Sequence, residues 1–247
     1  MAFTDLEIER YARHLVLREV GGPGQQALKA ARVLIVGAGG LGSPAALYLA
    51  AAGVGTVILV DPDTVDLSNL QRQVLFTEDD LGRPKAEAGT DRLAALNPHI
   101  FVAGFPEAFD ASTADELCEG VDLVLDGTDD FAVRYAVNAA CVKHGKPLVS
   151  GAIGRWTGQV GVFRSKPCYR CLVPEIPPDA ETCVAVGVVG ALAGVIGSMM
   201  ALEAIKLIVG AGEPLTGRLL IYDALSAETR TVKVGADPEC PVCGGGT

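Results

Sequence analysis

A glycine-rich turn between two apolar segments constrains the fold of this chain more than any other feature. Residues 32–36 (RVLIV) and 56–61 (TVILVD) are continuous apolar runs with the length and composition of buried parallel strands. Three glycines follow the first run directly: Gly37, Gly39 and Gly42. Residues 45–52 are typical of a helix, and the stretch between the two strands has room for one crossover helix alone. The segment is therefore predicted to form a βαβ unit whose helix N-terminus receives phosphate oxygens.

The rest of the chain continues this alternation of strands and helices. Further strands are predicted at residues 100–105, 121–125 and 147–150, and helices at residues 85–96 and 131–144. Strands with shorter connections follow at residues 159–164, 218–222 and 229–234. We therefore predict an α/β fold, with a doubly wound, Rossmann-like, mostly parallel sheet that antiparallel strands extend.

Two segments outside this alternation complete the predicted organisation. Thr4 and Glu7 form a capping box, which predicts an N-terminal helix over residues 1–20 that the following glycines end. Residues 166–182 are rich in proline and are predicted to form an irregular segment. Because neither an internal repeat nor a linker divides the chain, residues 1–247 are predicted to form a single domain.

The charged residues after the second strand separate two classes of nucleotide-binding protein. Asp61 ends that strand, where a carboxylate accepts hydrogen bonds from ribose hydroxyls in both ATP and NAD sites. Arg72 and Lys85 then flank an otherwise acidic loop. Each alone is typical of a solvated surface, but two cations beside a mononucleotide pocket suit a triphosphate. Nucleotidyl transfer is therefore favoured, and an NAD-dependent Rossmann oxidoreductase, for which no hydride-transfer site is identified, is the alternative.

Three carboxylates follow the strand predicted at residues 121–125, in the sequence DGTDD. Asp126, Asp129 and Asp130 lie at the carboxyl end of a parallel strand, the edge at which open α/β sheets bind ligands. Oxygen ligands suit a Mg²⁺ ion that keeps most of its waters. Asp129 or Asp130 can equally cap the helix that starts at Phe131, and both roles are compatible.

Four of the seven cysteines form two C-x-x-C pairs: Cys168 and Cys171, and Cys240 and Cys243. Two such pairs describe a closed tetrahedral Zn²⁺ site of structural type, which ties the end of the chain to the irregular segment. A redox pair is the alternative, although neither pair opens a helix after a strand in the thioredoxin manner. Cys183 belongs to no pair and lies near a predicted helix N-terminus, where a thiol becomes nucleophilic; a buried structural cysteine is the simpler interpretation.

The charge of the chain excludes some partners and leaves one segment to explain. A formal net charge of −10 has the wrong sign for binding nucleic acid. Residues 183–202 carry no charge and are long enough to span a membrane, but they are mainly Ala, Gly and Val and run on into Glu203 and Lys206. We therefore predict a buried helix, packed on the core or on a second subunit. The N-terminus has no secretory signal pattern, which favours the cytoplasm.

Ordered motifs run from the first helix to the last cysteine. They are RYARHL, GAGGLG, DPDTVDLSNLQRQ, LGRPKAE, DGTDDF, TCVAVGVVGALAGVIGSMMALEAIK and the paired cysteines. This set resembles the ubiquitin-activating superfamily and, among its branches, the MoeB and ThiF adenylyltransferases. The resemblance implies that Mg-ATP reacts with the C-terminal glycine of a ubiquitin-like sulfur carrier protein of the MoaD or ThiS kind. The products would be an acyl adenylate and pyrophosphate, for sulfur transfer of the molybdopterin or thiamine type, and the enzyme would be a homodimer.

The resemblance also implies roles for individual residues. Gly40 would lie against the nucleotide, Asp61 would hold the ribose and Lys85 would neutralise phosphate charge. One stretch would line the phosphates: Ser68, Asn69, Leu70, Gln71 and Arg72. Asp129 would bind or position Mg²⁺, and Arg13 would reach the γ-phosphate from the neighbouring subunit. The zinc ligands would be Cys168, Cys171, Cys240 and Cys243, and Cys183 matches a crossover-loop cysteine that some relatives use for a covalent sulfur adduct.

Two differences from the family pattern are visible. The family commonly has asparagine where this chain has Asp130, so the sharing of roles between Asp129 and Asp130 stays open. No rhodanese-like sequence follows Gly246, so the sulfur donor is expected to be a separate protein, such as a cysteine desulfurase or a rhodanese.

Overall fold

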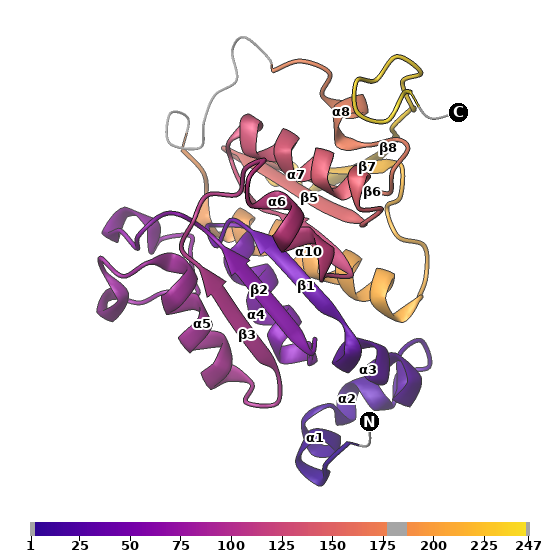
Figure 1. Cartoon of the computed structure of the whole chain (residues 1–247). Coiled ribbons are helices and arrows are strands. Elements are labelled where there is room, and N and C mark those ends of the chain that lie inside the picture. Colours follow the sequence, from indigo (N-terminus) through magenta and orange to yellow (C-terminus); the bar gives the residue numbers. More distant parts are fainter. Residues whose placement is uncertain (1–2, 177–186, 246–247) are drawn as a thin grey trace.

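One mixed sheet forms the centre of the computed structural model, which describes residues 3–176 and 187–245. Its strands are β1 (Arg32–Val36), β2 (Thr56–Val60), β3 (Phe101–Phe105), β4 (Leu123–Asp126), β5 (Leu148–Gly154), β6 (Thr157–Phe163), β7 (Arg218–Asp223) and β8 (Glu228–Lys233). They lie in the order β3-β2-β1-β4-β5-β6-β7-β8 (Figure 1). The first five strands of this order (β3, β2, β1, β4 and β5) are parallel to one another. Strands β6, β7 and β8 extend the sheet in antiparallel pairs, which confirms the predicted fold class.

Helices cover both faces of the sheet. They are α1 (Asp5–Arg10), α2 (Ala12–Leu15), α3 (Gly21–Ala30), α4 (Gly42–Ala52), α5 (Lys85–Leu96), α6 (Ala114–Glu119), α7 (Phe131–Lys143), α8 (Tyr169–Leu172) and α10 (Gly190–Val209), with short 3-10 helices η1 (Leu67–Asn69) and η2 (Glu78–Asp80). Val33 and Ile35 of β1 pack in a core with α4, α5 and α10, whereas Leu34 and Val36 pack with α6 and α7 on the other face. Because both faces are covered, successive residues of the strand are all buried, which explains the uninterrupted apolar run.

From Gly190 onward, the uncharged segment forms helix α10, which packs on the sheet. It begins at Gly190 and ends at Val209, and it has the length and composition of a membrane span. Leu192, Ile196 and Met200 are buried in the core, and a Cβ atom at Gly197 would collide with the ring of Pro44 on α4. This close approach explains why the helix is rich in small residues, and it confirms the prediction of a packed helix.

The N-terminal region differs from the single helix predicted over residues 1–20. The capping box of Thr4 and Glu7 is present, but α1 ends at Arg10, and α2 ends at Leu15. Tyr11, between the two helices, is buried where Asn97 Nδ2 donates to its hydroxyl at 2.9 Å. The glycines predicted to end the helix instead open α3, in which Pro23 occupies the first turn, where a helix needs no N–H from it.

These N-terminal helices lie at the amino edge of the parallel strands (Figure 1). Gln25 of α3 donates to the carbonyl of Ala52 at 2.8 Å, and Ala52 precedes β2. Asn97, which holds Tyr11, precedes β3. Arg13 of α2 therefore lies at the amino edge of the sheet, and the carboxyl ends of the parallel strands lie at the opposite edge.

Candidate functional site: a nucleotide pocket and a four-cysteine cluster

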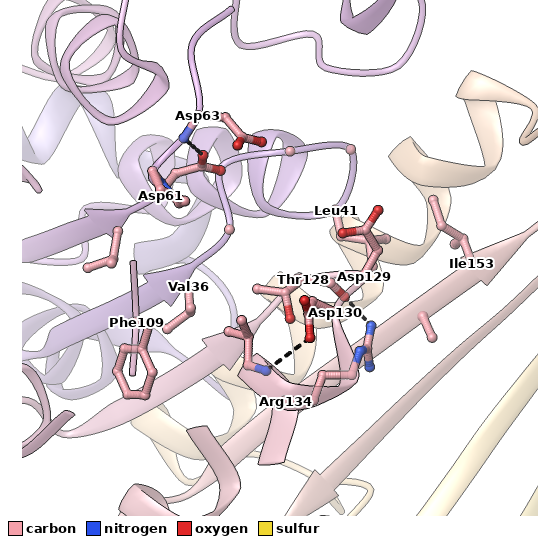
Figure 2. A pocket seen from close by; sticks show the side chains of 18 of the residues that line it. Val36, Leu41, Asp61, Asp63, Phe109, Thr128, Asp129, Asp130, Arg134 and Ile153 are labelled. Atoms are coloured by element: carbon pink, nitrogen blue, oxygen red, sulfur yellow. Dashed lines mark hydrogen bonds between the residues drawn. The ribbon is translucent and has the colours of Figure 1, made fainter. Parts of the chain in front are cut away.

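A cavity of about 680 Å³ opens at the carboxyl edge of the parallel strands (Figure 2). The turns after β1 and β4 both line it, at the point where the strand order reverses, which is where open α/β sheets bind ligands. The cavity is lined by these residues of the predicted site: Gly37, Gly39, Gly40, Asp61, Asn69, Arg72, Lys85, Asp129 and Asp130. The structure therefore brings together, in one pocket, side chains from four separate motifs.

The glycines of the turn have different structural tasks. Gly37 has a φ of +87°, a conformation that favours glycine, and it packs against the backbone of Thr128. A Cβ atom at Gly42 would collide with the carbonyl oxygen of Gly37, so Gly42 permits close packing of helix on strand and does not line the cavity. At Gly40 a Cβ atom would make only ordinary contacts, 3.5 Å from Arg72 Cδ. Gly39 and Gly40 thus form the surface of the turn that faces the cavity.

Asp61 is buried at the end of β2 and is fixed by the backbone. Its Oδ2 accepts a hydrogen bond from Ala38 N–H at 2.7 Å, and its Oδ1 accepts one from Asp63 N–H at 2.9 Å. Burial raises the pKa of Asp61, although the positive charge of Lys85 and these two N–H groups oppose the shift. Each carboxylate oxygen keeps a second lone pair, which suits the hydroxyls of a ribose.

Two cations line the same pocket as Asp61. Lys85 is 5% exposed and its Nζ lies 2.8 Å from Asp63 Oδ2. Arg72 donates to the carbonyl of Ser68 at 3.1 Å, and its aliphatic part packs beside Gly40. An anion between the glycine turn and these two side chains would meet positive charge from both, as a polyphosphate requires.

The three carboxylates of the DGTDD sequence have three different environments. Asp126 is fully buried and accepts hydrogen bonds from Thr128 and from Ser150 Oγ. Its role is therefore structural: it links the turn after β4 to β5. Asp130 caps α7: its Oδ1 accepts from Ala132 N–H at 2.6 Å and Val133 N–H at 3.3 Å. The Asp129 carboxylate accepts no hydrogen bond from any described residue and lines the cavity on the side opposite Asp61 and Asp63 (Figure 2). Asp129 is therefore the carboxylate best placed for a cation.

Two pocket residues escaped the sequence analysis. Arg134 of α7 is 4% exposed and lines the cavity beside Asp126, whose carboxylate lies 3.8 Å away. Burial opposes its charge, but Asp126 and Tyr169 together raise the pKa of Arg134. Gln73 is also buried, and its Oε1 has no hydrogen-bond partner among the described residues. The only signal in the sequence is their position. Arg134 lies three residues after Phe131, where the predicted helix begins at the pocket, and Gln73 directly follows Arg72.

Some predicted site residues lie outside the cavity. Ser68, Leu70 and Gln71 belong to the loop around η1, but they do not line the cavity. Ser68 supplies a backbone carbonyl to Arg72, and Leu70 packs against the core. Arg13 is exposed at the opposite edge of the sheet, and Cys183 lies outside the described residues.

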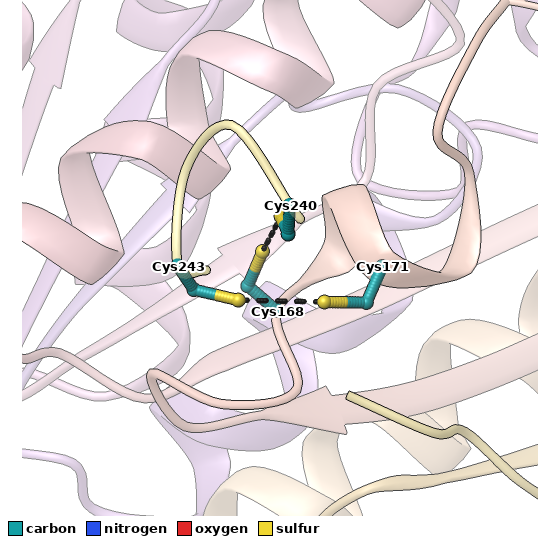
Figure 3. Close-up of side chains that lie close together, drawn as sticks. All are labelled: Cys168, Cys171, Cys240 and Cys243. Atoms are coloured by element: carbon teal, nitrogen blue, oxygen red, sulfur yellow. Dashed lines mark hydrogen bonds between the residues drawn. The ribbon is translucent and has the colours of Figure 1, made fainter. Parts of the chain in front are cut away.

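The four paired cysteines converge near the end of the chain (Figure 3). Their sulfur atoms all lie within 4.8 Å of one another, with 3.7 Å between Cys168 and Cys240 and 3.3 Å between Cys171 and Cys243. A tetrahedral zinc–thiolate site with bonds of about 2.3 Å needs sulfur separations of roughly 3.8 Å. The cluster therefore fits a metal site.

Comparison with known proteins identifies relatives along nearly the whole chain. Residues 11–242 match the ThiF family. The chain is 49% identical to the sulfur carrier protein adenylyltransferase of Thermus thermophilus, over 99% of this chain and 93% of that protein. It is 48% identical to the molybdopterin-synthase adenylyltransferase of Escherichia coli, over 98% of each. These names favour the adenylation prediction and give no support to an NAD-dependent oxidoreductase.

A solved structure shares the fold. The crystal structure of Escherichia coli MccB with MccA-N7isoASN superposes with a TM-score of 0.84 at 25% identity, over 96% of this chain and 74% of that one. The likeness includes the mostly parallel sheet and its antiparallel extension. From the family match and the two relatives at 48% and 49% identity, we conclude that the chain belongs to the ThiF family.

Proposed function

We propose that this chain adenylates the C-terminal glycine of a ubiquitin-like sulfur carrier protein with Mg-ATP and releases pyrophosphate. One observation carries the proposal: a single pocket combines the glycine turn, Asp61, two cations and an unpaired carboxylate. The names of the relatives support the carrier as substrate. Molybdopterin-type or thiamine-type sulfur transfer is the proposed pathway.

The first chemical step needs positioning and charge, and it needs no general base. The carrier's terminal carboxylate is already ionised at neutral pH, so it can attack the α-phosphorus directly. A bond forms between a carboxylate oxygen of the carrier and the α-phosphorus. The bond from the α-phosphorus to the oxygen that bridges it to the β-phosphate breaks, and pyrophosphate leaves with the electron pair. Arg72 and Lys85 would stabilise the charge that accumulates on pyrophosphate, while Asp61 fixes the ribose and therefore the attack angle.

Asp129 is the proposed residue for Mg²⁺. Its carboxylate faces the cavity and accepts no hydrogen bond from the described residues, and a hydrated Mg²⁺ takes one or two such ligands beside phosphates. When bound, the ion would neutralise phosphate charge. Asp130 is assigned to the helix cap, because its Oδ1 already accepts two backbone N–H groups.

The four-cysteine cluster is the proposed zinc site. With four thiolates and no open coordination position, the ion would be structural. Asn138 Nδ2 and Asp237 N–H each lie 3.5 Å from a cysteine sulfur, Cys168 and Cys171 respectively, and would support the thiolates.

A homodimer is the proposed assembly. Val195 and Leu202 of α10 are 39% and 59% exposed, and Tyr48 of α4 is 58% exposed, so an apolar surface accompanies these helices. Arg13 lies at the sheet edge away from its own pocket, so a contribution to the γ-phosphate requires a second subunit. The remaining proposals are a separate sulfur donor, a cytoplasmic location and a covalent role for Cys183.

Product mass tests the proposed function most simply. The chain is mixed with MoaD-like and ThiS-like carriers and Mg-ATP, and each carrier is weighed by mass spectrometry. A carrier heavier by one adenylate, absent when its terminal glycine is deleted, is expected. Unmodified mass for every carrier, with a protein that still binds ATP, would contradict the proposal.

A further inference from the structure

The Arg134 guanidinium ties together the two strand ends on one side of the pocket. It comes from the first turn of α7 and is 4% exposed. One of its terminal nitrogens donates both to the carbonyl of Thr128 and, at 2.8 Å, to the carbonyl of Gly151. Thr128 lies in the turn after β4, and Gly151 lies in β5, so the two hydrogen bonds join neighbouring segments of the cavity wall.

Other contacts hold the guanidinium in this orientation. The second terminal nitrogen lies 3.4 Å from Ser150 Oγ and 3.8 Å from Asp126 Oδ2. Asp126 in turn accepts hydrogen bonds from the backbone and side chain of Thr128. The ring of Tyr169 covers the guanidinium, with 5.9 Å from its carbon to the ring centre. A planar fork with several donors satisfies this set of acceptors, which an ammonium group cannot do at once.

Thr128 is the residue before Asp129. The hydrogen bonds from Arg134 therefore hold the backbone next to the carboxylate that faces the cavity. Asp129 accepts no hydrogen bond from the described residues, so its carboxylate is placed by the backbone on either side and by the attraction of the Arg134 charge, which in turn raises the pKa of Arg134. On one side the backbone is held by Arg134 and Asp126, and on the other by the Asp130 cap.

We propose that Arg134 is a positioning residue: it fixes the Thr128–Asp129 turn so that the Asp129 carboxylate meets the divalent cation of Mg-ATP. The inference rests on the proposed function, specifically on Asp129 as the cation ligand. Arg134 would not touch the reacting atoms, because its donors are directed to protein acceptors.

The test compares cation binding among variants of the full-length protein. Arg134→Lys keeps the charge and loses the fork, and Arg92→Lys, at an exposed position on α5, is the control. For each variant, Mn²⁺ binding in the presence of a non-hydrolysable ATP analogue is measured by electron paramagnetic resonance. The Mg²⁺ concentration that gives half-maximal carrier-dependent ATP–pyrophosphate exchange is measured in parallel.

We expect at least a tenfold weaker cation affinity in Arg134→Lys, with exchange largely restored at high Mg²⁺, and no change in Arg92→Lys. Unchanged cation affinity in a folded Arg134→Lys protein would overturn the inference. Asp129→Asn separates this failure from failure of the proposed function: if it also leaves cation binding unchanged, the assignment of Asp129 is wrong instead.

A second pair of measurements applies if Arg134→Lys does not fold. The double variant Asp126→Asn, Arg134→Gln removes both charges and so leaves no unpaired buried ion. It is expected to show the same loss of cation affinity. In addition, a crystal structure of the wild-type protein with Mg²⁺ and the analogue should retain the bond from Arg134 to the Thr128 carbonyl. A guanidinium that turns to the nucleotide instead would contradict a positioning role.

Discussion

The ammonium nitrogen of Lys85 lies 2.8 Å from a carboxylate oxygen of Asp63, and the two side chains differ sharply in exposure, at 6% and 67%. A buried cation without a partner is costly, so Asp63 stabilises Lys85 while the pocket is empty of anions. Because solvent reaches Asp63, water would solvate its carboxylate if a phosphate of the proposed ATP substrate took its place beside Lys85. The pair therefore keeps a cation ready in the pocket.

Removing a pocket cation should abolish activity without unfolding the protein. For Lys85→Ala and Arg72→Ala, we expect carrier-dependent ATP–pyrophosphate exchange to fall by about 10²–10³-fold, the usual cost of one transition-state charge contact. Arg72→Ala should change the melting temperature little, whereas Lys85→Ala should lower it modestly, because the buried Asp61 carboxylate loses a nearby positive charge. Lys143→Ala, at an exposed ion pair with Asp115, is the matched control. Normal exchange in either pocket variant would remove its assigned role.

Asp129 and Asp130 should separate activity from stability. Asp130→Ala removes the N-cap of α7, which typically costs about 1 kcal/mol and lowers the melting temperature by roughly 2–4 °C. Asp129→Asn should change the melting temperature little and abolish exchange, because that carboxylate accepts no hydrogen bond from the described residues and contributes less than Asp126 and Tyr169 to the raised pKa of Arg134. Calorimetry and the exchange assay on both variants check the division. The reverse pattern would show that the two roles are exchanged.

Acid should weaken the anchoring of the N-terminal helices. The hydrogen bond from Lys29 and the N–H of Thr4 lower the pKa of Glu7 from 4.5 to about 2. A lowered carboxyl pKa contributes stability that is present above pH 4.5 and is lost as the pH falls towards 2. Glu7→Gln should therefore melt at a lower temperature than wild type at pH 7, with a gap that closes by pH 2.

Glu9→Gln, on the same helix and exposed, serves as the control for this pH series. It should melt like the wild type at every pH. A constant gap between Glu7→Gln and wild type across the range would show that the salt bridge does not account for the difference.

Metal removal should affect the nucleotide pocket as well as the chain end. Cys168 caps α8 and Cys171 lies within it, and Tyr169 and Val173 from this segment line the cavity. If the metal contributes about 3 kcal/mol, as a crosslink across a long loop does, its loss lowers the melting temperature by roughly 6–12 °C. Calorimetry and titration with an ATP analogue should show both a lower melting temperature and weaker binding. Unchanged nucleotide affinity in the metal-free protein would show that α8 holds its place without the metal.

The sequence predicted the parallel strands and the glycine turn because their signals are local. Apolar runs such as residues 32–36 are long enough to exclude alternatives, and a Cβ atom at Gly42 would collide with the protein itself. The paired cysteines were equally clear, because their spacing carries the geometry of a metal site. For such features, the residues that determine the structure lie within a few positions of one another.

The misjudged features depend on contacts between distant residues. The N-terminal helix breaks at Tyr11, which Asn97 holds from 86 positions away. Arg134 resembles any helix arginine until β5 brings the Gly151 carbonyl to it. Helix α6, over Ala114–Glu119, was missed because its acidic sequence has little apolar periodicity and its burial comes from α7.

Carrier-dependent exchange of labelled pyrophosphate into ATP tests the central claim most directly. The chain is incubated with Mg-ATP, labelled pyrophosphate and a sulfur carrier, either intact or lacking its terminal glycine. We predict that label enters ATP only when the carrier is intact, because only the carboxylate of its terminal glycine can form the adenylate reversibly. Label in ATP without any carrier, or with the shortened carrier to the same extent, would contradict the account.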